Sequence, residues 1–128
     1  MDIPVFVSCP TSLSEEQNAS RALILRQLAR FNLEPRALGR SDYPTELPLR
    51  EVLLLARHCS GGMILGFEQY RSLNGIQKPD TPEAKPHDTP LKVPTPWNHL
   101  EAGILFGLRL PILIFREEGI EGGVFDPG

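Results

Sequence analysis

The chain has 128 residues, of which 41% are hydrophobic and 23% are charged, and its formal net charge is −3. This length and composition predict one domain with a buried core, and they exclude a wholly disordered chain. Lys and Arg do not cluster, which argues against a nucleic acid partner. We find no signal peptide and no apolar run near the roughly 20 residues that span a bilayer, so we expect a cytoplasmic protein without membrane contact.

The apolar pattern alternates between short continuous runs, typical of buried strands, and helical periodicity. In chain order it predicts strand 3–8, helix 14–31, strand 34–39, helix 48–58, strand 61–67, helix 96–108, strand 111–115 and a short strand 123–125. Runs that are apolar on both faces, alternating with helices, are typical of a parallel sheet covered by helices on both sides. The predicted fold class is therefore α/β, with three layers and a central parallel sheet of four to five strands.

Capping residues support these helix boundaries. Ser12 or Ser14 can cap the first helix, and Asn32 suits a left-handed residue at its end. Thr95 is the predicted cap of the third helix, and Pro96 occupies its first position.

Residues 71–95 differ in character from the rest of the chain. Six of the 13 prolines lie between positions 79 and 96, mixed with Lys, Asp, Thr and Glu. This composition cannot build a core and predicts an extended excursion. It is either a lid over the binding site or a tolerated insertion.

Glu101, on the third predicted helix, is the leading candidate for chemistry. It lies four residues after Trp97, so we expect it on an inward face together with Leu100, Ile104 and Leu108. Burying a carboxylate on that face without a partner would be costly.

A carboxylate in this position has two possible roles. It bonds to a neighbour such as Arg40, Ser8 or a backbone N–H, or it lines a cleft beside Trp97. Near a ribose, a carboxylate can stabilise an oxocarbenium-like transition state or attack the anomeric carbon. Both reactions fit cleavage of an N-glycosidic bond.

The remaining candidates follow strands of the predicted sheet, where ligands bind beyond the carboxyl ends. The stretch Arg40-Ser41-Asp42-Tyr43-Pro44 is either a polar turn or part of the site. In the site, Arg40 would hold a phosphate or carboxylate, and Tyr43 would stack on a ring. Ser8 could hydrogen-bond a ribose or a phosphate.

The cysteines point away from redox or metal chemistry. Cys9 and Cys59 each lie at the edge of an apolar segment, where an inert thiol is the usual outcome. Neither has a second Cys or a His at metal-ligand spacing, so we predict no metal site and no disulfide framework.

Three segments together resemble the TIR domain family. Phe6-Val7-Ser8-Cys9 resembles its first box, Arg40-Ser41-Asp42-Tyr43-Pro44 its BB loop, and Trp97-Asn98-His99-Leu100-Glu101 its Trp-x-x-x-Glu element. The same order and the Glu-Ala-Gly step also resemble the nucleoside 2-deoxyribosyltransferases. Both families share a flavodoxin-like core, so the resemblance implies one flavodoxin-like (TIR-like) domain over residues 1–128. Because the chain stops soon after its last clear strand, we expect a fragment of a longer protein.

The resemblance implies that Glu101 is the catalytic residue. It also implies Phe6, Ser8, Arg40 and Asp42 as nucleotide contacts, and the full set of predicted substrate-binding residues adds Cys9, Tyr43 and Trp97. The leading function is an NAD glycohydrolase or cyclase that cleaves the nicotinamide–ribose bond, as a bacterial defence or signalling effector. NAD would then be the substrate, and no cofactor is expected.

Two alternatives stay open at this point. One is a nucleoside 2-deoxyribosyltransferase or N-glycosidase, in which Glu101 is the nucleophile. The other is a non-catalytic TIR-like module that binds a nucleotide or a protein. The resemblance also implies a small nucleotide or nucleoside partner and a homo-oligomer.

Overall fold

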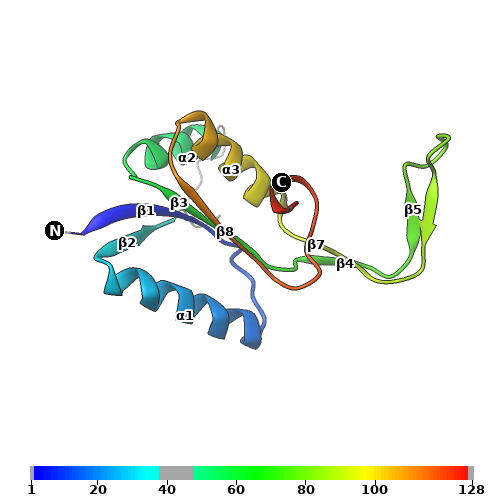
Figure 1. The fold of residues 1–128 in the computed structure, drawn as a ribbon, viewed down its shortest axis with the longest axis horizontal. Coiled ribbons are helices and arrows are strands. Elements are labelled where there is room, and N and C mark those ends of the chain that lie inside the picture. The colour runs from blue at the N-terminus through cyan, green and yellow to red at the C-terminus, as the bar shows by residue number, and fades with distance from the viewer. Residues whose placement is uncertain (1, 38–47, 127–128) are drawn as a thin grey trace.

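The computed structural model describes residues 2–37 and 48–126. Its centre is a four-stranded parallel sheet in the order β2-β1-β3-β8. The strands are β1 (Ile3–Ser8), β2 (Leu33–Arg36), β3 (Gly62–Gly66) and β8 (Ile112–Arg116). Helix α1 (Glu15–Arg30) covers one face, while α2 (Pro48–Arg57) and α3 (Pro96–Gly107) cover the other (Figure 1). The α/β class with a parallel sheet flanked by helices is therefore confirmed.

Apolar side chains fill the space on both faces of the sheet. Successive residues of a strand point to opposite faces, so β1 and β3 each contribute to two clusters. The cluster on the α2/α3 face contains Phe6, Val52, Ala56, Cys59, Ile64, Ala102, Leu105, Ile120 and Phe125. The cluster on the α1 face contains Val5, Val7, Leu28, Met63, Leu65 and Phe67. No helix in the described ranges has both the length and the apolar character needed to cross a membrane.

The predicted helix ends are confirmed where the structure describes them. Ser14 caps α1, and Gln17 completes the capping box by accepting a hydrogen bond from the Ser14 N–H. Asn32 adopts a φ of 58° just past the helix. Thr95 caps α3 by accepting from the Trp97 N–H at 3.3 Å.

The Pro-rich excursion forms a ribbon that leaves the body of the protein (Figure 1). It consists of two antiparallel pairs, β4 (Tyr70–Ser72) with β7 (Leu91–Val93) and β5 (Gly75–Gln77) with β6 (Lys85–His87). The excursion thus pairs with itself, which the composition did not predict. A two-stranded ribbon consists of edge strands, and edge strands tolerate proline.

The short strand predicted at the C-terminus is wrong. Residues Gly123–Phe125 form a 3-10 helix instead. Gly122 and Gly123, with φ values of 97° and 57°, turn the chain so that the Phe125 ring enters the core beside Gly66.

Candidate functional site

The site begins at the carboxyl end of β1, which Ser8 ends. In the sheet, β2 lies on one side of β1 and β3 on the other, so the strand order changes direction here. Parallel sheets bind ligands beyond the carboxyl ends of the strands, at the point where the strand order changes direction. Helix α3 packs across β1 and β3 and brings its second turn against Ser8.

Three polar side chains meet in this position. The Ser8 hydroxyl donates a hydrogen bond to Oε1 of Glu101 at 2.7 Å. Asn98 Nδ2 donates to Ser8 Oγ at 2.9 Å and approaches the Ser8 carbonyl oxygen at 3.4 Å. Because Asn98 donates to Ser8 Oγ, the hydroxyl proton of Ser8 is directed toward Glu101. Asn98, Ser8 and Glu101 therefore form a one-way chain of hydrogen bonds.

All three side chains are buried. Their exposed fractions are 1% for Ser8, 0% for Asn98 and 3% for Glu101. A buried carboxylate requires donors that replace its lost hydration. The Ser8 hydroxyl supplies one of them.

Asn98 has unused capacity for hydrogen bonding. Its Oδ1 is buried and accepts no hydrogen bond from any residue that the structure describes. Most buried side-chain oxygens do have a partner, so such an atom requires an explanation.

The inward face of α3 is the predicted one except at Leu100, because Glu101 is buried and Trp97, Ile104 and Leu108 pack against the core. Its buried residues are Asn98, Glu101, Ala102 and Leu105, whereas Leu100 is exposed. Expecting Leu100 on the inward face was wrong, because the helix is rotated to bring the polar pair at i and i+3 against β1. The three-residue spacing of Asn98 and Glu101 was the signal that could have identified Asn98, which the sequence reasoning missed.

The other predicted site residues that the structure describes belong to the apolar clusters on the two faces of the sheet. Phe6 shares the strand face of Ser8 but belongs to the apolar core. Trp97 is half-buried and packs against the same core. Cys9 packs on the opposite, α1 face, where its Sγ contacts the Pro10 carbonyl oxygen at 3.4 Å. Arg40, Asp42 and Tyr43 lie outside the described residues.

An apolar groove of about 830 Å³ runs along the neighbouring flank of α3. The helix lines it with His99, Ala102, Gly103 and Phe106, and β8 with Ile112 and Ile114. The His99 ring also packs edge-on against Phe125. Ser8, Asn98 and Glu101 are not among the residues that line this groove, and the Glu101 carboxylate points toward Ser8.

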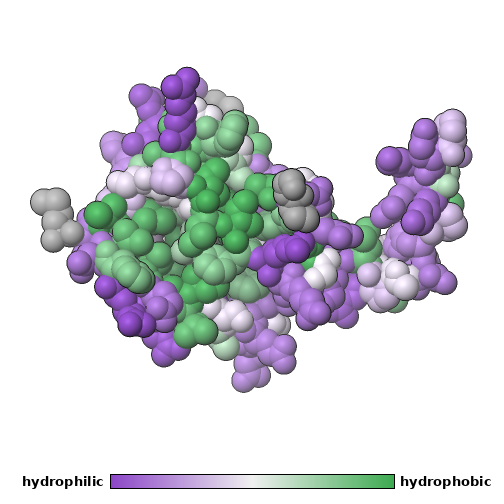
Figure 2. Space-filling model, in the orientation of Figure 1, coloured by the Kyte–Doolittle hydropathy of each residue, from purple (hydrophilic) through white to green (hydrophobic). Residues whose placement is uncertain are grey.

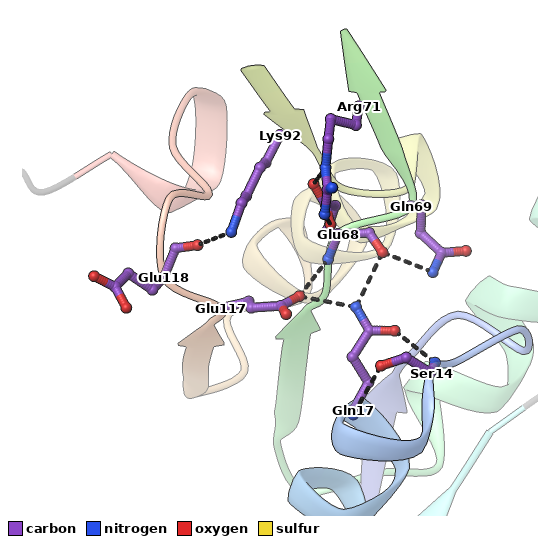
Figure 3. A network of polar contacts seen from close by, with 8 residues as sticks. All are labelled: Ser14, Gln17, Glu68, Gln69, Arg71, Lys92, Glu117 and Glu118. Carbon is purple, nitrogen blue, oxygen red and sulfur yellow. Dashed lines mark hydrogen bonds and ion pairs between the residues drawn. The ribbon is translucent and has the colours of Figure 1, made fainter. Parts of the chain in front are cut away.

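A second polar network holds the base of the ribbon (Figure 3). Glu117 Oε1 accepts from Gln17 Nε2 and from the Glu68 N–H, each at 2.8 Å. Arg71 donates to both carboxylate oxygens of Glu68, at 2.8 and 2.6 Å. Lys92 donates to the Glu118 carbonyl at 3.3 Å. These contacts tie α1, the end of β8 and the ribbon together.

Two ionisable groups outside the Ser8–Asn98–Glu101 cluster, Glu68 and Cys59, have shifted pKa values. Hydrogen bonds from Arg71 lower the pKa of Glu68 below its ordinary value. Burial raises the pKa of the Cys59 thiol, which disfavours the reactive thiolate. Within the described residues, no group of three or more His, Cys, Asp or Glu side chains could hold a metal ion.

Comparison with known proteins adds no family assignment. No protein-family model matches the chain, and neither does any curated protein.

Proposed function

We propose that this protein is an NAD glycohydrolase or cyclase with a TIR-like, flavodoxin-like core and Glu101 as its catalytic residue. The observation that carries the proposal is the Glu101 carboxylate, which Ser8 orients at the edge where the strand order changes direction. The resemblance of three segments to TIR domains supports NAD as the substrate.

The proposed reaction breaks the bond between the ribose C1′ and the nicotinamide nitrogen. The bonding electron pair leaves with nicotinamide, and positive charge develops on the ribose. The Glu101 carboxylate would stabilise this charge, as carboxylates do in glycoside cleavage. Water, or a nucleophile within the same molecule, then forms the new bond to C1′ and gives the hydrolysed or cyclised product.

The neighbouring residues would prepare Glu101 for this task. Asn98 fixes the Ser8 hydroxyl, and Ser8 fixes one oxygen of Glu101, so the carboxylate is oriented before the substrate binds. Fixed dipoles of this kind stabilise developing charge without reorganising during the reaction. Trp97 would form one wall, and Arg40, Asp42 and Tyr43 would contact the nucleotide.

The test is nicotinamide release from NAD by concentrated protein, with the products resolved by chromatography. We expect Glu101→Gln to lower the rate by at least about a hundredfold, because the neutral amide cannot stabilise the developing charge. Glu83→Gln, at an exposed glutamate of the ribbon, is the matched control and should keep full activity. Circular dichroism verifies that both variants are folded. A folded Glu101→Gln protein with normal turnover contradicts the proposal.

The deep burial of Glu101 favours a second candidate function, a non-catalytic module that binds a nucleotide. Calorimetry that detects NAD binding while chromatography detects no product would favour this module. Deoxynucleosides are assayed in parallel. Base exchange on them, with NAD left intact, would identify a deoxyribosyltransferase.

A further inference from the structure

Strand β8 forms an apolar edge of the sheet. It pairs with β3 on one side, and no strand in the described part of the chain pairs with its other side. Leu113 is 55% exposed, and Ile114 and Phe115 are also exposed. Figure 2 shows hydrophobic surface between α1 and α3, in the area where Figure 1 places β8. Proteins usually protect such edges with charges, proline or a covering segment.

Hydrogen bonds identify the backbone groups that point outward from this edge. The Pro111 carbonyl accepts from the Gly62 N–H, and the Glu117 N–H donates to the Gly66 carbonyl. The N–H and C=O groups of successive strand residues point to opposite sides. The odd-numbered residues of β8 therefore bond to β3, and Ile112, Ile114 and Arg116 direct their N–H and C=O groups outward.

We infer that a second copy of this chain pairs antiparallel with β8 around a two-fold axis at Ile114. The outward N–H and C=O groups of Ile114 would bond to those of the same residue in the second copy. Ile112 of each copy would bond in the same way to Arg116 of the other. This register satisfies every outward backbone group of the strand.

The side chains in this register match on both faces of the sheet. Leu113 of one copy would lie opposite Phe115 of the other. Both side chains are on the α1 face, because Leu113 pairs with Met63 and Phe115 with Leu65 in β3, and both β3 residues belong to the cluster on that face. The two Ile114 side chains meet on the α3 face. Apolar pairs directly opposite each other stabilise antiparallel strands. A shift by one residue would place side chains of opposite faces against each other, so the register is well specified.

Charge also favours a second copy over an unrelated strand. Arg109 precedes β8, and Glu118 follows it. Both residues are exposed. Antiparallel pairing brings the start of one strand to the end of the other, so Arg109 of each copy approaches Glu118 of its neighbour. Opposite charges at the rim of an interface favour the matching orientation.

The apolar groove along α3 would become part of the same interface. Ile114 lines this groove and would lie at the two-fold axis, so the grooves of the two copies would meet there. Phe106, with 78% of its surface exposed, would be brought toward the second copy. Burying this ring and the β8 side chains supplies the apolar core that stable homodimer interfaces require.

The first experiment measures the mass of the protein by sedimentation. We expect about twice the 14.3 kDa of one chain. Leu113→Lys and Ile114→Lys should each raise the dimer dissociation constant by more than about a hundredfold, because they place unpaired charge in the centre of the interface. Leu73→Lys changes a leucine on the ribbon that is 66% exposed and should leave the dimer intact. Circular dichroism verifies the fold of each variant.

The second experiment tests the register by disulfide trapping. Facing residues of a hydrogen-bonded antiparallel pair have Cα atoms about 5.5 Å apart, within disulfide range. Ile114→Cys should therefore cross-link to the dimer under mild oxidation, while Leu73→Cys stays monomeric in the same gel. A monomeric protein, or a dimer that Leu113→Lys and Ile114→Lys leave unchanged, overturns the inference. A dimer that does not cross-link through Cys at position 114 overturns the register. None of these outcomes depends on the reaction at Glu101.

Discussion

At the scale of single residues, hydrogen bonds join Asn98 and Glu101 of α3 to Ser8, which lies 93 positions before Glu101 in the chain. Each donor in this chain has a defined acceptor, from Asn98 to Ser8 and from Ser8 to Glu101. Such buried networks are costly when they lose one member, because the remaining groups keep their desolvation penalty. Ser8 is the central member.

Replacing Ser8 tests this network independently of activity. Ser8→Ala removes the donor to the buried Glu101 carboxylate and the acceptor of Asn98 Nδ2. We expect the free energy of unfolding to fall by about 1–3 kcal/mol. Urea denaturation measures the change, with exposed Ser60→Ala as the control. A loss for Ser8→Ala as small as that for the control would show that Ser8 does not support Glu101.

Two glycines offer a matched test of packing under α3. A Cβ on Gly62 would overlap Cδ1 of buried Leu105, whereas a Cβ on Gly103 would meet no atom within 4 Å. We expect Gly62→Ala to destabilise the protein by about 1–3 kcal/mol through overpacking. Gly103→Ala should stabilise it by up to about 1 kcal/mol, because alanine favours the helix. Thermal denaturation compares the two, and shifts of equal sign would contradict this account of the α3–β3 contact.

At the scale of elements, the helix ends are encoded locally and then serve longer-range contacts. Gln17 closes the capping box of α1, and its Nε2 also donates to Glu117 and to the Glu68 carbonyl at 3.1 Å. A residue in the first turn of α1 therefore also contacts the end of β8 and the base of the ribbon (Figure 3).

The Arg71–Glu68 pair should make the ribbon base sensitive to acid. Because Arg71 lowers the pKa of Glu68, the ion pair gives its full stabilisation at pH values above the ordinary glutamate pKa. The contribution is lost as the pH falls through the lowered pKa, where the carboxylate is protonated. We expect the NMR signal of the Arg71 Nε–H to shift over this acidic range. Glu68→Gln should abolish this pH-dependent change of the NMR signal. A change that persists in the variant would assign the titration to another group.

At the scale of the whole molecule, the chain divides into a layered body and a ribbon outside its core (Figure 1). The inferred dimer would join two bodies through β8 and continue the sheet across the two-fold axis. The Ser8–Asn98–Glu101 cluster lies at the carboxyl end of β1, and antiparallel pairing would place the two clusters at opposite ends of the joined sheet. Each copy would then contain its own complete cluster.

The sequence predicted the regular elements of the body well, because periodicity and caps act over a few residues. The strands and helices of the body occur near their expected positions, and Asn32 and Thr95 have their expected roles. The two errors, at Leu100 and at 123–125, arise from contacts with distant segments. Leu100 is exposed because Asn98 and Glu101 turn toward β1, and Phe125 enters the core instead of extending a strand.

The order of strands and helices in the body, the helix caps and the inward position of Glu101 on α3 were predicted from the sequence alone. These features depend on neighbours within about one turn of helix or one strand, where residue type and spacing suffice. Only the tertiary structure decided that Ser8 and Asn98 hold Glu101, and that β8 is left as an apolar edge. Both depend on how α3 rotates and on which strands are paired, and these are set by packing between segments far apart in the chain.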